Sequence, residues 1–458
     1  MFKKLLAMSM ATLMVLSIVG CGNNGKVADD GRVTILLWEK PPLDAPESVV
    51  KEYEYRMEKT REKFPHINIV DEALKPGTDY VQQYDRALMA GQAPTATKMF
   101  SYTSIPTRIK NGTIADITNL VGNWDLKNEG KVLSSFDEAL STSDGKWFAI
   151  PYAGYVMGTT YNSKAIREGG GDPDNLPTTW AEFAELGQKL TDVSVPRFGY
   201  ELLGMEWNSW PFTAWVWSAG GEMVRDNGDG TYKITFNEEP GVDAASFWNE
   251  MVWKYEMTQK DVLQDISKII EDVISGRACF AWVPTGELKQ ENLEPYGLTV
   301  ADFGFMAMPV KDESIQNPSF TGGEVITFNP KATEEEIKAA WDVFTFMYYD
   351  EEMLTESWGI FSQYGSADTQ IPGRIDLYGK KLDIFTLIPA QMKADLLEIS
   401  EVAIPEPFCQ NWNDLKNAIA SPLQQIILKK DITREEIQKI LDDSAEELYA
   451  KYPDSFRK

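Results

Sequence analysis

Histidine is almost absent from this chain. The 458 residues contain one, His66, at the start of an expected strand. A catalytic triad built on histidine and a metal site of several histidines are therefore nearly excluded. The chain also lacks a Gly-x-Ser-x-Gly elbow, a phosphate-binding loop and a dinucleotide fingerprint. We predict a protein with no catalytic residue, no metal and no cofactor.

Basic residues are scarce as well. The 44 lysines and arginines are outnumbered by 70 aspartates and glutamates, which gives a net charge of −26. Proteins that bind nucleic acid neutralise its phosphates with clustered Lys and Arg, so nucleic acid is not an expected partner. We interpret the acidic excess as a solvated surface.

A membrane-spanning segment is also missing. Residues 5–19 carry no charge and follow Lys3 and Lys4, but this run is too short to span a bilayer. It indicates a signal peptide over residues 1–20. Residues 18–21 (IVGC) resemble the bacterial lipobox, which implies that Cys21 is acylated and that residues 21–31 form a flexible tether. The alternative is an ordinary cleavage site followed by a chance cysteine.

Beyond Cys21 the chain has only two cysteines, Cys279 and Cys409. They could pair in an extracytoplasmic compartment. Cys279 lies in the apolar run ACFAWV, which is typical of a buried strand, so we expect two separate buried thiols.

Strand and helix patterns alternate along the first part of the chain. Residues 32–38 (RVTILLW) form a continuous apolar run, as in a central parallel strand. A helix is predicted from Glu47 to just before Pro65, a second strand over residues 66–70, and a second helix over residues 79–90. This alternation predicts an α/β fold.

The segment 144–180 is dense in aromatic and β-branched residues and is predicted to be extended. Thr179 and Glu182 form a capping box, which begins a helix that ends near Leu190. A second capping box, Thr433 with Glu436, begins the C-terminal helix.

The motifs DGKWFAIPY, YNSKAI and LPTTWAEF occur here in order, and SGRACFAW, GFMAMPV and GGEVITFN follow later in the chain. Together they resemble the type II extracellular solute-binding proteins, in particular the carbohydrate-binding family 1 of ABC importers. The sequence departs from the family at Thr95, where an aspartate usually follows the proline.

This resemblance implies a two-lobed type II periplasmic-binding-protein fold. Each lobe should be a mostly parallel sheet flanked by helices, and crossing hinge strands should join the lobes, one of them in GGEVITFN. We expect lobe 1 to comprise residues 32–153 and 328–362, and lobe 2 to comprise residues 154–327 and 363–458.

Tryptophan is abundant, with 14 in the chain. A sugar has apolar C–H faces and polar hydroxyl edges, so a cleft for it needs flat aromatic platforms and a few carboxylate or amide partners. We assign to packing the tryptophans inside predicted elements or tight turns: Trp124, Trp147, Trp180, Trp248, Trp253 and Trp341. Other tryptophans lie at element ends or in loops, where open α/β folds bind their ligands.

The resemblance implies ligand contacts at several positions. Trp207 and Trp412 fall on stacking aromatics of maltodextrin-binding members, and Tyr155 falls where those relatives place a cleft glutamate. The complete candidate ligand-binding set is Trp38, Glu39, Tyr102, Tyr155, Trp207, Trp210, Trp282, Glu324, Trp358 and Trp412. For any single tryptophan of this set a half-buried core position is about as plausible.

The sequence therefore predicts a lipoprotein on the outer face of a bacterial cytoplasmic membrane, anchored only through Cys21. It should act as a monomer that captures a short oligosaccharide and delivers it to the permease subunits of an ABC transporter. One alternative of the same fold is a receptor for a polyamine or another cation. An alternative of another class is a secreted glycoside hydrolase, which would need two carboxylates roughly 5 to 10 Å apart across the sugar.

Overall fold

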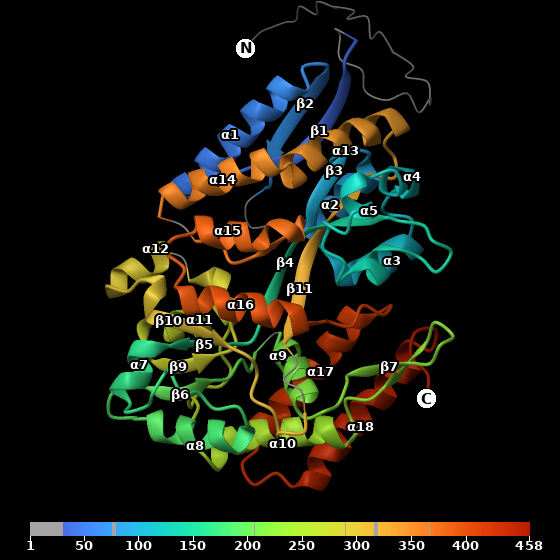
Figure 1. Cartoon of the computed structure of the whole chain (residues 1–458). Coiled ribbons are helices and arrows are strands. Elements are labelled where there is room, and N and C mark those ends of the chain that lie inside the picture. Colours follow the sequence, from blue (N-terminus) through green and yellow to red (C-terminus); the bar gives the residue numbers. More distant parts are fainter. Residues whose placement is uncertain (1–30, 76–78, 206, 289, 316–318, 366) are drawn as a thin grey trace, which may run out of the picture.

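Two lobes stacked one above the other form the molecule, and two long strands pass between them (Figure 1). This computed structural model describes residues 31–75, 79–205, 207–288, 290–315, 319–365 and 367–458. The predicted signal peptide, Cys21 and nearly all of the predicted tether lie outside the described residues. In the part that is described, no helix combines the length and the apolar character that crossing a membrane requires.

The first lobe is built on β1 (Val33–Lys40), which pairs in parallel with β2 (Ile67–Ala73). Helix α1 (Glu47–Lys63) connects these strands, and α2 (Tyr80–Ala90) follows them, as the sequence predicted. Asp79 caps the start of α2 by accepting a hydrogen bond from the amide of Gln82, and Gly91 ends it with φ at 70°. The remaining elements of this lobe are β3 (Ala96–Ser101), α3 (Ile105–Lys110), α4 (Thr118–Gly122), α5 (Asp125–Asn128), α6 (Asp137–Leu140), α13 (Glu334–Tyr349) and α14 (Glu351–Gln363).

The crossing strands are β4 (Ala149–Met157) and β11 (Phe320–Phe328), which pair antiparallel along most of their length. They place Ala153 opposite Glu324, next to a register shift that lies between Glu324 and Val325. A Cβ atom at Gly322 would come within 2.3 Å of the Tyr155 hydroxyl oxygen, so only glycine leaves room for this tyrosine. Short strands β12 (Ile371–Pro372) and β13 (Ile404–Pro405) extend this sheet at its two sides.

The second lobe has a four-stranded sheet in the order β10-β5-β9-β6. Its strands are β5 (Thr159–Asn162), β6 (Phe198–Glu201), β9 (Ala278–Ala281) and β10 (Phe303–Met306). Helices that surround it include α7 (Ser163–Glu168), α8 (Trp180–Leu190), α9 (Ser209–Ser218), α10 (Glu239–Trp253), α11 (Ile266–Ser275), α16 (Ala390–Val402), α17 (Trp412–Leu428) and α18 (Arg434–Lys451). The hairpin of β7 (Val224–Asp226) and β8 (Tyr232–Ile234) lies near the C-terminus.

The predicted two-lobed α/β fold is confirmed, but the sheets are not mostly parallel. Parallel pairing occurs between β1 and β2, between β6 and β9 and between β11 and β13, whereas β4, β5 and β11 make antiparallel pairs. The β4–β11 pair is antiparallel because these strands carry the chain between the lobes in opposite directions.

Both predicted capping boxes are present. The Thr179 and Thr433 side chains accept hydrogen bonds from the amides of Glu182 and Glu436, and each glutamate reaches back to the amide of its cap. Cys279 and Cys409 are buried and free, which confirms the expectation of two separate thiols. Helix α9 begins at Ser209, so Trp210 lies in its first turn.

The boundary between the lobes differs from the prediction after α14. Residues 371–384 were assigned to lobe 2, but β12 pairs with β4, and α15 (Tyr378–Ile384) packs against α14 of the first lobe. The Arg374 guanidinium holds this segment against the first lobe by donating a hydrogen bond to the Tyr349 carbonyl oxygen at 2.7 Å. The segment therefore returns to the first lobe before the chain enters α16.

Candidate ligand-binding cleft

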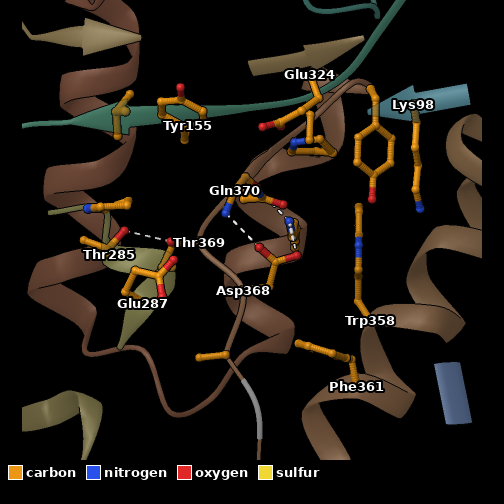
Figure 2. A pocket seen from close by; sticks show the side chains of 18 of the residues that line it. Lys98, Tyr155, Thr285, Glu287, Glu324, Trp358, Phe361, Asp368, Thr369 and Gln370 are labelled. Atoms are coloured by element: carbon orange, nitrogen blue, oxygen red, sulfur yellow. Dashed lines mark hydrogen bonds and ion pairs between the residues drawn. The ribbon is translucent and has the colours of Figure 1, made fainter. Parts of the chain in front are cut away.

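A cavity of about 630 Å³ lies where the two lobes meet at the crossing strands. The lining comes from α1, β3, α13 and α14 of the first lobe, from β4 and β11, and from the segments 207–210 and 284–287 of the second lobe. The segment 367–372, which follows α14, completes the wall. Figure 2 shows Tyr155 and Glu324 at the crossing strands, with Thr285 and Glu287 on one side and Trp358 and Phe361 on another.

Cations on the first-lobe wall are held by carboxylates. The Lys98 ammonium group lies 2.7 Å from a Glu39 carboxylate oxygen and donates to the Tyr348 hydroxyl, also at 2.7 Å. It sits 4.7 Å from the Tyr152 ring centroid. Burial opposes the charge of Lys98, but Glu39, Tyr152 and Tyr348 together outweigh this effect, so the pKa of Lys98 lies well above its ordinary value. Lys98 therefore stays protonated at neutral pH.

Two further ion pairs belong to the same wall. The Arg56 guanidinium pairs with Glu52 one turn earlier in α1 and donates to the Met347 carbonyl oxygen at 3.1 Å. The Lys381 ammonium group lies 2.7 Å from Asp368 and donates to the Gln370 carbonyl oxygen at 2.7 Å. These contacts fix both cations, so the wall is preorganised before any ligand arrives.

Glu324 stands apart from these pairs, on crossing strand β11. No ion pair to its carboxylate is found among the described residues, and burial raises the pKa of Glu324 to about 7. A hydrogen bond from its own backbone N–H and, to a smaller extent, the positive charge of Lys98 partly counteract this rise. The carboxyl group is consequently divided between its neutral and charged forms near neutral pH.

Aromatic rings form the second-lobe wall. Trp210 meets Trp282 edge to face, with 4.5 Å between ring centroids, and Tyr155 meets Trp210 in the same way at 6.2 Å. Trp207 makes an edge contact with Trp210 at 6.4 Å, but its side chain is 63% exposed. Trp207 also has φ at 74°, a left-handed conformation that is costly for a bulky residue.

The first lobe contributes a second aromatic surface from α14. Trp358 and Phe361 line the cavity, and the Lys381 ammonium group lies 5.6 Å from the Trp358 ring centroid. A hydrogen bond of 2.7 Å between the Thr285 and Thr369 hydroxyls links the second-lobe loop to segment 367–372 (Figure 2). The cavity is thus bounded by aromatic faces from both lobes, with hydroxyl, amide and carboxylate groups between them.

Half of the predicted ligand-binding set lines this cavity: Tyr155, Trp207, Trp210, Glu324 and Trp358. Three more lie outside the lining: Glu39 behind Lys98, Trp282 behind Trp210, and Trp38 beside Tyr80 and Tyr84 in the first-lobe core. Trp282 is 1% exposed, so it supports a lining residue rather than presenting a platform itself.

The other two predicted residues lie away from the cavity. Tyr102 is fully buried, stacked on Phe136 at 4.2 Å, and donates its hydroxyl to the Glu406 carbonyl oxygen at 2.7 Å. Trp412 is 1% exposed, and its indole N–H donates to the Glu406 carboxylate at 2.8 Å. Trp412 was chosen because it begins a helix and falls on a stacking position of the family, but that position does not determine which way a side chain points.

The prediction missed the charged wall and the segment 367–370. The Arg56 guanidinium lies 4.7 Å from the Tyr348 ring centroid and donates to the Met347 carbonyl oxygen, which is 291 positions away in the sequence. The local sequence therefore gave no sign of these contacts. One signal was available. Lys98 lies inside a strand with apolar residues at Ala96, Met99 and Phe100, and a lysine removed from water requires a carboxylate partner.

Among the described residues there is no group of three histidine, cysteine or acidic side chains that could hold a metal ion. The cleft is instead suited to reversible binding, because it combines aromatic surfaces with fixed polar groups in one concave site. Two lobes around such a site define the class of two-lobed solute receptors.

The family model for bacterial extracellular solute-binding proteins matches residues 45–353, which is more than half of the chain. The chain therefore belongs to this family, whose members are binding proteins and not enzymes. This membership removes the glycoside hydrolase alternative.

Two curated relatives are similar over shorter stretches. A maltotriose-binding protein of Pyrococcus abyssi is 24% identical over 220 residues, which is 46% of this chain and 42% of the relative. A probable amino-acid ABC transporter periplasmic-binding protein of Sinorhizobium fredii is 33% identical over 113 residues, which is 24% of this chain and 25% of the relative. The matched regions thus span less than half the length of either relative.

The fold extends the likeness to nearly the whole chain. An ABC transporter solute-binding protein of Thermotoga lettingae, bound with α-D-tagatose, superimposes with a TM-score of 0.71 at 18% identity. The superposition covers 91% of this chain and 99% of that protein. At this identity the likeness defines the fold of the chain.

Proposed function

We propose that this protein captures a short oligosaccharide outside the cytoplasm and delivers it to the permease of an ABC transporter. The observation that carries this proposal is the cleft itself. Trp207 and Trp210 from one lobe and Phe361 from the other, beside the largely buried Trp358, offer apolar faces to sugar rings, which need such platforms for their C–H surfaces. Platforms on both walls exceed what one sugar ring can contact, which favours more than one ring.

Polar groups between the platforms suit hydroxyl edges. Thr285, Thr369 and Gln370 line the cavity and can donate or accept hydrogen bonds, and the carboxylates of Glu287 and Glu324 can accept them. The volume of about 630 Å³ lies in the range of roughly 300 to 1,000 Å³ that is usual for small-molecule sites.

The names of two similar proteins favour a sugar as the ligand: one is a maltotriose-binding protein, and the other is bound with tagatose. The relative described as an amino-acid receptor matches only 24% of this chain, so it carries less weight. A ligand with aromatic-stacking faces fits the cleft better than a single amino acid does.

The proposal includes where and how the protein works. Acylation of Cys21 would hold a monomer on the outer face of the bacterial membrane, with residues 21–31 as the tether. The lobes, joined by β4 and β11, would close on the ligand by a hinge motion. Closure would bring both aromatic walls onto the same sugar.

A thermal-shift screen of the mature protein against an oligosaccharide library tests this function. A ligand present at about one hundred times its dissociation constant stabilises the folded state by roughly 2.7 kcal/mol, so a true ligand gives a clear increase in Tm. Chromatography of the released ligand should return it intact. If no saccharide in the library raises Tm, while amino acids or peptides do, the proposed function is wrong.

A further inference from the structure

Carboxyl groups outnumber cations around the cleft. Each of the three lining cations, Arg56, Lys98 and Lys381, has a carboxylate partner within ion-pair distance. Each also donates to or stacks on a further protein group. None of these three cations is left for an anionic ligand.

Two lining carboxylates have no such partner. Glu324 projects from β11 at the crossing strands, and Glu287 ends the short turn Thr285–Glu287 of the second lobe. Among the described residues no ion pair reaches either side chain, and the Glu324 carboxylate accepts a hydrogen bond from its own backbone N–H. Five carboxyl groups (Glu39, Glu52, Glu287, Glu324 and Asp368) thus surround three cations, which leaves two carboxyl groups without a cationic partner.

Glu324 is the more unusual of these two carboxylates. Burial raises its pKa to about 7, which means that its charged form lacks the solvation or the partner that would stabilise it. A buried carboxylate without a counter-charge is costly, and a ligand that supplies a positive charge removes that cost. A neutral ligand would seal the carboxyl group from water without supplying this charge.

We propose that the physiological ligand is an aminosaccharide, a short sugar whose protonated amine binds the Glu324 carboxylate while its rings stack on the aromatic walls. This inference rests on the proposed function and narrows it to a chemical class. Glu287, on the other side of the cavity, provides a second position for an amine (Figure 2).

A linear polyamine fits the same charges less well. It has no ring to stack on Trp207, Trp210 or Phe361 and no hydroxyl groups for Thr285 and Gln370. A sugar acid is disfavoured, because its carboxylate would meet Glu324 and Glu287 and would find each cation already paired.

Calorimetry on the mature protein tests the inference with matched saccharides. The saccharide that binds best in the screen is taken as the neutral reference. Its affinity at pH 7.5 is compared with the affinities of its aminodeoxy analogues and of its uronic-acid analogue. For a β-1,4-glucan backbone the probes are cellotriose, the glucosamine trimer and the uronic acid of cellotriose, and the N-acetylglucosamine trimer is the uncharged amide control. We expect at least one amine analogue to bind tenfold or more tightly than the neutral sugar, and the acid to bind at least tenfold more weakly.

Two variants assign the effect to Glu324. In Glu324→Gln the ratio of amine affinity to neutral affinity should fall at least tenfold. Glu447→Gln removes one carboxylate from the exposed face of α18 and should leave this ratio unchanged, which controls for net charge. Affinity for the amine should also increase as pH rises from 5.5 toward neutrality, because Glu324 ionises across that window, and should decrease again above the pKa of the amine, which then loses its charge.

The outcomes separate the inference from the proposed function. If neutral oligosaccharides bind and no amine analogue binds more tightly, the inference is overturned and the sugar-binding function stands. If amines bind more tightly but Glu324→Gln leaves the ratio intact, the assignment to Glu324 is wrong. If no saccharide of any charge binds, the function itself fails.

Discussion

Replacement of Trp207 by alanine should weaken ligand binding far more than it weakens the fold. Its side chain is 63% exposed and makes one ring contact, the edge contact with Trp210 at 6.4 Å. Just over a third of the roughly 250 Å² of a tryptophan side chain is therefore buried, or about 90 Å². At about 25 cal/mol per Å² this burial contributes about 2 kcal/mol at most to the free energy of unfolding.

The loss of affinity comes from the stacking contact. A platform that covers one face of a sugar ring is worth on the order of 1 to 3 kcal/mol in burial and ring geometry together, so Trp207→Ala should weaken binding roughly ten- to hundredfold. Isothermal titration calorimetry measures this change directly with the saccharide found in the screen.

Trp248 provides the matched control for stability. It is fully buried in α10 and meets Phe212 edge to face at 5.3 Å. Trp248→Ala should cost about 3 to 5 kcal/mol of unfolding free energy, as large core truncations do. A Trp207→Ala protein that melts as early as Trp248→Ala and binds sugar normally would refute the assignment of Trp207 to the cleft.

The backbone at Trp207 allows a second variant. Its φ of 74° costs a residue with a side chain about 1 kcal/mol or more, and glycine avoids that cost. Trp207→Gly should therefore melt at a higher temperature than Trp207→Ala while losing as much affinity. Equal melting temperatures would mean that the left-handed conformation stores no strain.

Three further predictions concern the anchor, the hinge and a buried acid. Cys21→Ala should move the protein from the detergent phase to the aqueous phase of a detergent separation, and an unmodified residue 21 in mass spectra of the native protein would contradict lipidation. Saturating ligand should reduce the radius of gyration in small-angle scattering, because the lobes close about β4 and β11; an unchanged radius would count against a hinge. Burial, reinforced by Asp272, raises the pKa of Glu201 to about 9, so the folded state holds this proton more tightly than the unfolded state. Its stabilising contribution is complete below the ordinary pKa of about 4.5 and is lost as pH rises toward 9, by up to about 1.4 kcal/mol per pH unit. Denaturant titrations should therefore show wild type losing stability relative to Glu201→Gln across this window, and parallel curves would exclude the shifted pKa.

Local sequence rules predicted the elements of this fold well, because the physical cause lies within a few residues. The crossing strands were implied by the family resemblance, whereas the Thr179 and Thr433 capping boxes and the helix over residues 79–90 were predicted from short patterns. The capping boxes and this helix depend on contacts between neighbours in the sequence.

Strand direction was harder to predict. The apolar runs of β1 and β2 suggested parallel sheets, and these two strands are parallel. The direction of β11 relative to β4 depends on how the chain passes between the lobes, and no local pattern encodes that path.

The cleft was predicted only in part, because contact with a ligand depends on direction as well as position. Trp207 and Trp412 both lie at the start of a helix, yet one is largely exposed in the cleft and the other is buried against Glu406. The first-lobe wall could not be assembled from the sequence, since Glu39, Lys98 and Tyr348 come from three distant elements.

The central claim is that one ligand is held between the two lobes. Calorimetric titration of the best saccharide into wild type, Trp207→Ala and Phe361→Ala tests it most directly, because these two aromatic residues belong to opposite lobes of the cleft. We predict one ligand per chain and a loss of affinity of roughly tenfold or more in each variant. Full affinity in either variant would show that the saccharide does not bridge the lobes, and full affinity in both would place its site elsewhere.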